Sequence, residues 1–376
     1  MTGRAVAAEG ERVFNFSAGP AVLPMDVLKQ IQEEMVCLPG VGQSVLEISH
    51  RSPAFDRILA ETVEALSTLL NVPNTHDILL LQGGASLQFS MVPMNLLRGG
   101  SQPADYLLTG SWGGLAAKEA RREGDVNIAW DNAPAYNRLP KAAEIALSEK
   151  PAYVHITSNE TIQGVQWQEE PDVRAPLVSD CSSDFLSRPI PVERYGLVYA
   201  CAQKNAGIAG VTVVIIRRDL LERSEKLDQS GRGLPSMLDY RTHAQNESRA
   251  NTPPVFAVYV LGLVCRWLKD SVGGLAQMRE RNESKSRSIY DVLDLSQGFY
   301  RGHAATECRS RMNVTFRLPS EELEKRFLEA AKARGLTDLK GHRSVGGIRA
   351  SLYNAMPEEG VKALRDFMVE FQARAG

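Results

Sequence analysis

Two charged side chains end two apolar segments of this sequence. Asp180 closes the stretch APLVSD, and Lys204 closes YGLVYACAQK. In an open α/β sheet the residues that end successive strands converge on one crevice, so these two side chains could act together on a ligand. A structural ion pair, or a lysine that extends into solvent, explains the same residues. The pair alone leaves these interpretations open.

Two further segments read as a strand, a turn and a helix. LLLQGGAS places the backbone N–H groups of Ala85 and Ser86 at the start of a predicted helix, where they can bind an anion. GSWGGLAAKEA places Trp112 on a turn, where an indole either fills the core or stacks on a planar ligand. An anion site, an aromatic plate, a carboxylate and an amine are together what pyridoxal phosphate requires. The combination therefore indicates this cofactor more specifically than any single feature does.

Short apolar runs alternate with amphipathic stretches along the first two thirds of the chain. This alternation predicts an α/β fold: a large domain with a mainly parallel sheet flanked by helices. One helix is expected over Phe55–Leu70, with Asn71 as its stop. The predicted strands are Asp77–Leu81, Tyr106–Leu108, Tyr153–Thr157, Leu177–Ser179, Leu197–Ala200 and Val211–Ile216.

The pattern changes after a long helical stretch, Val258–Leu293, that is interrupted at Gly273 and Gly274. The remaining pattern predicts a small C-terminal α+β domain. Its elements are a strand over 311–317, a helix that begins after Ser320, a strand over 347–353 and a last helix. We expect a large cofactor-binding domain over residues 25–275 and a small domain over 276–376. The N-terminal segment 1–24 joins them.

Composition restricts the class of protein. The chain has 376 residues, 43% of them hydrophobic, and its 43 basic and 45 acidic residues leave a net charge of −2. This balance argues against nucleic acid and anionic membranes as partners. Five cysteines without a C-x-x-C pair argue against a disulfide framework or a metal site. The longest apolar run, Asn251–Cys265, is too short to span a membrane, so we expect a soluble, cytoplasmic protein.

An ordered series of motifs covers nearly the whole chain. In this respect the sequence resembles the phosphoserine aminotransferases, which are pyridoxal-phosphate-dependent enzymes of fold type I. The motifs that carry the resemblance are FNFSAGPAVLP, ISHRS, LLLQGGAS, GSWGGLAAKEA, SNETIQGV, AQKN, NTPP and GHRSVGGIRASLYNAM.

The resemblance implies a role for each motif residue toward the cofactor. Lys204 would carry the cofactor covalently, Asp180 would pair with its ring nitrogen, and Trp112 would stack on its ring. The residues implied for the phosphate and the ring hydroxyl are Ala85, Ser86, Thr161 and Gln203, with Asn251 and Thr252 from a second subunit. Ser86 stands where several bacterial members carry an arginine, so one cationic contact is absent here.

The resemblance also implies the substrates, L-glutamate and a phosphorylated 2-oxo acid, and a homodimer with shared sites. Arg349 would bind the α-carboxylate. The other residues implied for substrate are Ser17, His50, His342 and Arg343, with Arg51 from the second subunit, and the basic ones could instead form a solvated surface. Basic side chains in two separated, glycine-containing motifs suit a phosphate dianion.

The implied reaction converts glutamate and 3-phosphohydroxypyruvate into 2-oxoglutarate and O-phosphoserine, a step of serine biosynthesis. A second candidate substrate is the homologous oxo acid of vitamin B6 synthesis, 3-hydroxy-2-oxo-4-phosphooxybutanoate. The sequence does not decide between these two phosphorylated oxo acids. The nearest rivals are an alanine or glyoxylate aminotransferase and a cysteine desulfurase. A non-catalytic cofactor-binding protein is a further alternative, although it need not keep both Lys204 and Asp180.

Overall fold

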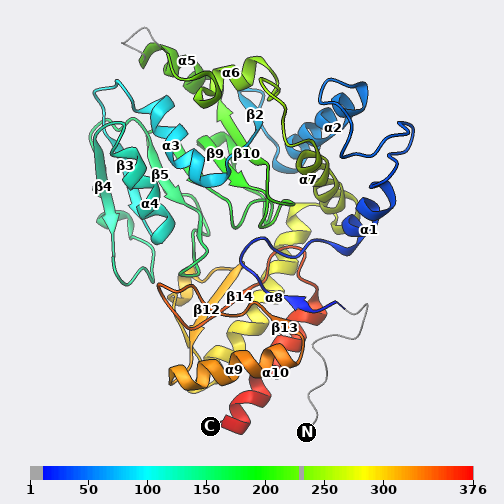
Figure 1. Cartoon of the computed structure of the whole chain (residues 1–376). Helices are drawn as coiled ribbons and strands as arrows, with labels where there is room; N and C mark the ends of the chain where they lie inside the picture. Colours follow the sequence, from blue (N-terminus) through cyan, green and yellow to red (C-terminus); the bar gives the residue numbers. More distant parts are fainter. Residues whose placement is uncertain (1–11, 228–232, 376) are drawn as a thin grey trace.

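A seven-stranded sheet forms the centre of the larger part of the molecule (Figure 1). The structure is a computed structural model that describes residues 12–227 and 233–375. The strand order is β2-β10-β9-β8-β5-β3-β4. The strands are β2 (His76–Leu81), β3 (Ala104–Leu108), β4 (Val126–Asp131), β5 (Val154–Thr157), β8 (Leu177–Asp180), β9 (Tyr195–Cys201) and β10 (Thr212–Arg217).

Strand direction brings the candidate residues to one edge of this sheet. From β9 to β4 every neighbouring pair is parallel, and β10 runs antiparallel to both β9 and β2. Six strands therefore end at the same edge, because two reversals around β10 leave β2 parallel to β9. The mainly parallel sheet is confirmed, and β4 is the strand that the sequence analysis did not predict.

Helices cover both faces of the sheet. They are α1 (Met25–Glu34), α2 (Pro53–Leu70), α3 (Gly84–Leu96), α4 (Ser111–Ala120), α5 (Arg218–Leu227), α6 (Tyr240–Gln245) and α7 (Val255–Trp267). Short 3-10 turns lie at Ala142–Glu144, Val192–Arg194, Ser236–Leu238 and Thr306–Cys308. The Oγ of Ser52 caps α2 by accepting the N–H of Phe55 at 3.3 Å. The helix ends at Asn71, as predicted, and this residue has a left-handed conformation.

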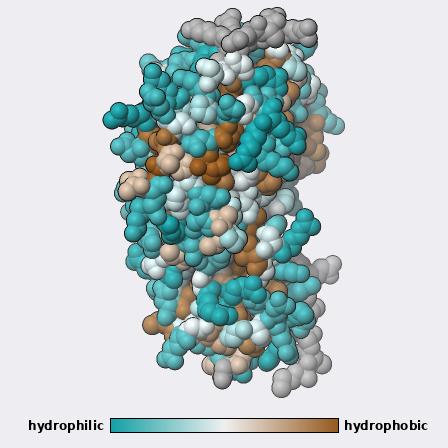
Figure 2. All heavy atoms as spheres, turned by 90° about the vertical axis from the view of Figure 1, so that its left-hand side faces the viewer, coloured by the Kyte–Doolittle hydropathy of each residue, from teal (hydrophilic) through white to brown (hydrophobic). Residues whose placement is uncertain are grey.

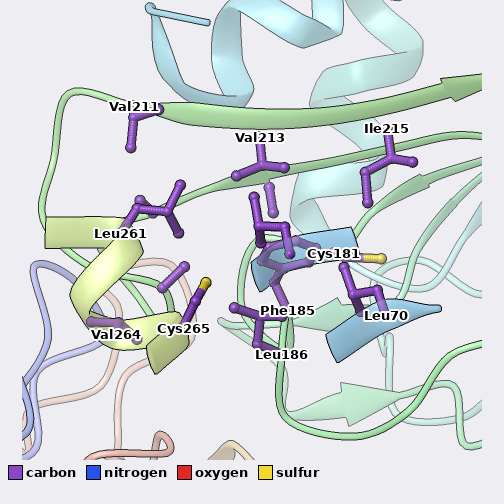
Figure 3. Close-up of a cluster of buried hydrophobic side chains, with 14 of the residues drawn as sticks. Leu70, Cys181, Phe185, Leu186, Val211, Val213, Ile215, Leu261, Val264 and Cys265 are labelled. Atoms are coloured by element: carbon purple, nitrogen blue, oxygen red, sulfur yellow. The ribbon is translucent and has the colours of Figure 1, made fainter. Parts of the chain in front are cut away.

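Two hydrophobic clusters sandwich the sheet. One packs α2 and α7 against it, and Figure 3 shows Leu70, Val213 and Leu261 within that cluster. The other packs α3, α4 and α5 against the opposite face, with Phe89 and Leu220 among its buried residues. Burying both faces explains why the strands read as continuous apolar runs.

The C-terminal part has its own sheet and core. A three-stranded antiparallel sheet has the order β11 (Arg301–Gly302), β12 (Asn313–Arg317), β14 (Ile348–Ser351). Helices α8 (Leu275–Leu295), α9 (Glu321–Ala333) and α10 (Glu358–Ala375) accompany it. Phe316, Phe327 and Phe367 are buried in the cluster that joins them. The α/β part and the α+β part thus match the predicted fold class.

Two connections tie the parts together. β1 (Phe14–Asn15) pairs in parallel with β13 (Leu336–Thr337), so the N-terminal segment joins the C-terminal part. The predicted interruption near Gly273 is a five-residue π-helix, Leu268–Val272, between α7 and α8. The domain limits 25–275 and 276–376 remain our proposal, and residues 1–11 and 376 lie outside the described residues.

The outer surface is mainly polar on the side that carries β3, β4 and α4. Figure 2 shows this side as mostly hydrophilic, with small hydrophobic patches. Among the described residues, no helix combines the length and the apolar composition that a membrane crossing requires.

Candidate active site

Lys204 lies three residues beyond the end of β9, beside Asp180 at the end of the neighbouring strand β8. Asp180 is paired with Tyr199 across the two strands. The Nζ atom of Lys204 donates a hydrogen bond of 2.9 Å to the Oγ1 atom of Thr161. Thr161 belongs to the short hairpin between β6 (Asn159–Glu160) and β7 (Val165–Gln166). The amine of Lys204 is therefore hydrogen-bonded to a hydroxyl group of the candidate site.

Burial and neighbouring charges control the ionisation of this pair. Burial raises the pKa of Asp180, whereas Lys204 and Ser182, whose N–H lies 2.9 Å from Oδ1, act to lower it. Burial lowers the pKa of Lys204, but Tyr353 and other acidic neighbours, including Asp180, leave that pKa raised overall. The amine is consequently an ammonium at neutral pH. It must lose a proton before it can form a covalent bond.

Trp112 provides an aromatic face beside the lysine. The Nζ atom of Lys204 lies 5.7 Å from the indole centroid. Phe89 lies behind the indole with a centroid distance of 6.4 Å. We predicted that Trp112 lies on the turn before the helix. It is instead the second residue of α4, because the helix begins at Ser111.

The start of α3 follows the carboxyl end of β2. Gly83 and Gly84 form the predicted turn, with φ angles of 92° and 69°. Ala85 and Ser86 lie in the first turn of the helix, where backbone N–H groups lack helical partners. Gln82 donates from Nε2 to the carbonyl oxygen of Thr252 at 3.0 Å and to Oδ1 of Asn251 at 3.5 Å. Asn251 and Thr252 thus lie beside this end of β2 in their own chain.

The N-terminal segment passes directly over Lys204. A Cβ atom on Gly19 would lie 3.4 Å from Cγ of Lys204. The N–H of Ala21 donates to the carbonyl oxygen of Gln203 at 2.9 Å, and the N–H of Gly19 donates to Oγ of Ser17 at 3.3 Å. These contacts place Ser17 and Gln203 near Lys204, and the roles implied for them toward substrate and cofactor stay predictions.

The C-terminal sheet contributes a basic group. Arg349 lies on β14, and His342 and Arg343 lie on the loop that precedes this strand. Burial lowers the pKa of His342, and the charges of Arg349 and Arg343 lower it further. The Tyr353 phenol feels the charges of both Lys204 and Arg349, which act to lower its pKa against the effect of burial. Tyr353 therefore lies near both Lys204 and Arg349, and Arg349 also lies near His342.

His50 and Arg51 lie elsewhere in the chain. They line a groove of about 1120 Å³ between α2, the beginning of β2 and the segment that follows α6, together with Asp77, Ser248 and Arg249. The single chain does not bring these two residues into the group that surrounds Lys204.

Two residues near Lys204 were not predicted from the sequence. Glu160 is fully buried and accepts the N–H groups of Trp112 and Gly113. Tyr353 donates from its hydroxyl to the carbonyl oxygen of Ala18 at 2.8 Å. Glu160 stands inside the motif SNETIQGV, next to Thr161, and that position was the available signal.

Comparison with known proteins decides between the related enzyme classes. The family model described as aminotransferase class-V matches residues 13–364. The phosphoserine aminotransferase of Rhodopirellula baltica is 54% identical over 371 residues, which are 98% of this chain and 97% of the relative. The chain belongs to the phosphoserine aminotransferase family.

Solved structures of the same family agree with this assignment. The phosphoserine aminotransferase from Bacillus circulans subsp. alkalophilus is 48% identical with a TM-score of 0.93, covering 98% of this chain and 100% of the other. The pyridoxal-phosphate-bound enzyme from Trichomonas vaginalis is 42% identical with a TM-score of 0.89, covering 95% and 100%. The chain is accordingly a pyridoxal-phosphate-dependent aminotransferase, and the predicted reaction class and cofactor are confirmed.

The buried polar atoms at the carboxyl edge of the sheet fit such a ligand. Buried polar atoms normally find a hydrogen-bond partner. Five that have none within the described residues belong to strand ends and to the proposed site: Thr109 Oγ1, Trp112 Nε1, Thr157 Oγ1, Thr212 Oγ1 and Arg349 Nε. A polar, planar group bound between the sheet edge and β14 could supply partners to atoms of this kind.

Proposed function

We propose that this chain transfers the amino group of L-glutamate to 3-phosphohydroxypyruvate, giving 2-oxoglutarate and O-phospho-L-serine. The observation that carries the proposal is the placement of the Lys204 amine among Thr161, Asp180 and Trp112, on the side facing Arg349. Arg349 in turn adjoins His342 and Arg343. The site thereby combines a reactive amine with cationic side chains that can bind the two anionic groups of each substrate.

The cofactor-binding side consists of strand ends and one helix start. Lys204 would carry the cofactor through its amine, and Asp180 would keep the ring nitrogen protonated. Trp112 would stack on the ring, and Thr161 and Gln203 would hold its hydroxyl side. The first-turn N–H groups of α3 at Ala85 and Ser86 would hold the phosphate. Bound pyridoxal phosphate supplies an electron sink for the electron pair released at the substrate α-carbon.

Lys204 also moves the proton. In the half-reaction with glutamate, Nζ would take the proton from the α-carbon of glutamate as a general base. In the opposite half-reaction Nζ returns a proton to the α-carbon of the new amino acid. The contact with Thr161, 2.9 Å from Nζ, holds the amine near the site between these steps.

The basic residues recognise the two substrates. Arg349 binds the α-carboxylate, which both amino acids present. His342 and Arg343, with Ser17, receive either the phosphate of the oxo acid or the γ-carboxylate of glutamate. Guanidinium groups suit this dual use because their planar donors bind carboxylate and phosphate alike.

We infer a homodimer in which each site takes Arg51, Asn251 and Thr252, together with His50, from the second chain. The separate groove supports this arrangement for His50 and Arg51, because these two residues do not lie beside Lys204 in their own chain. For Asn251 and Thr252, which contact Gln82 of their own chain, the assignment to the second chain rests on the family resemblance alone. A cytoplasmic location is also our inference, supported by cysteines that lack the spacing of a disulfide framework.

Steady-state kinetics tests the substrate assignment. Purified protein loaded with pyridoxal phosphate should use glutamate with 3-phosphohydroxypyruvate far better than with the unphosphorylated hydroxypyruvate. Assays with 3-hydroxy-2-oxo-4-phosphooxybutanoate measure the preference between the two phosphorylated acids. Equal rates with phosphorylated and unphosphorylated acids would contradict the proposed role of the basic loop.

A further inference from the structure

The start of α4 is held by a hairpin that lies far from it in the sequence. Glu160 accepts the N–H of Trp112 at Oε2, 3.1 Å away, and the N–H of Gly113 at Oε1, 3.0 Å away. The residue before the helix, Gly110, has no side chain with which to cap it. Glu160 therefore satisfies two of the N–H groups that a helix start leaves without partners, at the positive end of the helix dipole.

The same hairpin holds two more groups of the site. Oε1 of Gln163 accepts the N–H of Ser111 at 3.3 Å, and Nε2 of Gln163 donates to the Ser111 hydroxyl at 2.7 Å. Thr161, between the two, accepts the hydrogen bond from Lys204. Three residues of one hairpin thus fix the first residues of α4 and the amine of Lys204 relative to each other.

The fit between Glu160 and the helix start is close. A Cβ atom on Gly110 would lie 2.4 Å from Cδ of Glu160, so any side chain there would occupy the place of the carboxyl group. Glu160 has no exposed surface, and a buried carboxylate costs stability unless its partners compensate. A structural cap alone could be supplied by a serine or an aspartate before the helix, without burying a distant carboxylate.

Several charged and titratable groups face this carboxylate. Burial raises the pKa of Glu160 to about 7, and the N–H groups of Gly113 and Trp112 oppose this rise. Asp180 at the end of β8 raises the same pKa, and Lys204 lowers it. Tyr136, from the segment after β4, feels the charge of Glu160 as well. The carboxyl group thus changes its charge near neutral pH.

We propose that Glu160 is a positioning residue for the cofactor: by holding the backbone of Trp112 and Gly113, it sets the plane on which the cofactor ring stacks. This inference rests on the proposed function to the extent that Trp112 stacks on the cofactor. The ionised carboxylate accepts both N–H groups more strongly than the protonated form does. The indole is therefore held more firmly above pH 7 than below it.

The dissociation constant of pyridoxal phosphate from the full-length apoprotein tests this role. Glu160→Gln keeps the shape of the side chain, but places an NH₂ group against one backbone N–H. At pH 8.5 we expect the dissociation constant to rise about tenfold, the loss expected for one charge-assisted hydrogen bond. The ratio of variant to wild-type constants should approach one at pH 5.5, because both side chains are then neutral. The near-ultraviolet circular dichroism of the bound cofactor should weaken in parallel.

Glu144→Gln is the matched control. Glu144 also accepts a backbone N–H at a helix start, that of Lys141 at 2.7 Å, but it lies on the surface. Its replacement should leave the dissociation constant and the dichroism unchanged.

Gly110→Ala provides a second variant, because its methyl group displaces the carboxyl group without removing it. It should weaken cofactor binding as Glu160→Gln does. An unchanged dissociation constant in either folded variant, at all pH values, would overturn the inference. If wild-type protein failed to bind the cofactor at all, the proposed function would fail instead, so the two failures are distinguishable.

Discussion

Among the described residues, the neighbours of the Lys204 amine include the Thr161 hydroxyl, the Trp112 ring and the Asp180 carboxylate. This environment separates it from an ordinary strand-end lysine, whose ammonium reaches solvent. Hydroxyl and carboxylate both stabilise the charged amine. The chain thereby keeps a single amine in place at the edge of the sheet until a substrate or cofactor exchanges with it.

Lys204→Ala should abolish transamination while leaving the fold intact. The loss should be roughly 10⁴-fold or more, because the variant lacks both the covalent attachment and the general base. Borohydride reduction of the wild-type holoenzyme, followed by peptide mapping, should label Lys204 alone. Lys285 is the internal control, since it is buried but donates to the carbonyl oxygens of Leu352 and Tyr353. A label on Lys285 or on any other lysine would refute the assignment.

Arg343→Ala and Arg349→Ala should separate the two anion sites. Arg343→Ala should lower kcat/KM for the phosphorylated oxo acid roughly tenfold more than for glutamate, because a dianion loses more from a missing cationic donor. Arg349→Ala should lower both values to a similar extent, since each substrate presents an α-carboxylate. Equal losses for both substrates in the Arg343 variant would count against a phosphate role of the basic loop.

Residues that end strands were predictable from the sequence, and their partners were not. Lys204 and Asp180 follow apolar runs, so their convergence follows from strand direction alone. Glu160 reaches the site through the hairpin of β6 and β7, whose strands of two residues each are too short to show a period, and Tyr353 lies in a segment that the sequence analysis predicted as a strand without assigning it a contact with the site. His50 and Arg51 were expected from a motif, and only the structure shows that they line a different groove.

At the scale of elements, the hairpin of β6 and β7 connects the two sheets. Its Asn159 donates from Nδ2 to Oδ1 of Asn313 on β12 at 2.8 Å, and the carbonyl oxygen of Gln163 accepts the Thr315 hydroxyl at 2.8 Å. The other side of the hairpin holds the start of α4. A change in this hairpin therefore affects the Lys204 side and the Arg349 side together.

Gly164→Ala should be strongly destabilising. Gly164 has a φ of 70°, and an added Cβ would lie 2.6 Å from the carbonyl oxygen of Asn313. Backbone strain and the clash together should lower the free energy of unfolding by roughly 3 kcal/mol. Gly40 is the matched control, because its φ is 74° but an added Cβ would meet nothing within 4 Å. Gly40→Ala should cost only about 1 kcal/mol. Chemical denaturation measures both, and equal costs would contradict the contact with Asn313.

Glu160→Gln should change how the stability of the apoprotein depends on pH. The folded pKa of about 7 lies above the ordinary value of 4.5, so the folded chain binds more protons between these pH values. The contribution of the Glu160 carboxyl group to the free energy of unfolding is fully present below pH 4.5 and is lost as the pH rises to 7. The variant should lose roughly 3 kcal/mol less than wild type over this interval. Urea unfolding at pH 5 and pH 8 measures the difference, and parallel losses would contradict the raised pKa.

At the scale of the whole molecule, the placement of the basic residues favours two chains acting together. Arg51 lies in a groove bounded by α2 and the beginning of β2, whereas Lys204 lies at the opposite, carboxyl edge of the sheet. A two-fold arrangement could place the groove of each chain against the sheet edge of the other. Such a relation between chains cannot be predicted from periodicity within a single sequence.

Mixing two inactive variants tests this arrangement. Lys204→Ala and Arg51→Ala chains are unfolded together and refolded, so that about half of the dimers are mixed. In the shared-site model a mixed dimer has one site with both defects and one with neither, because the intact Lys204 of one chain meets the intact Arg51 of the other. Activity should then return to roughly a quarter of the wild-type value per site. If Arg51 served its own chain, every site would keep one defect and mixing would restore nothing. Absence of recovery, with mixed dimers confirmed by mass, would reject the shared site and leave the assignment of Lys204 and Asp180 unaffected.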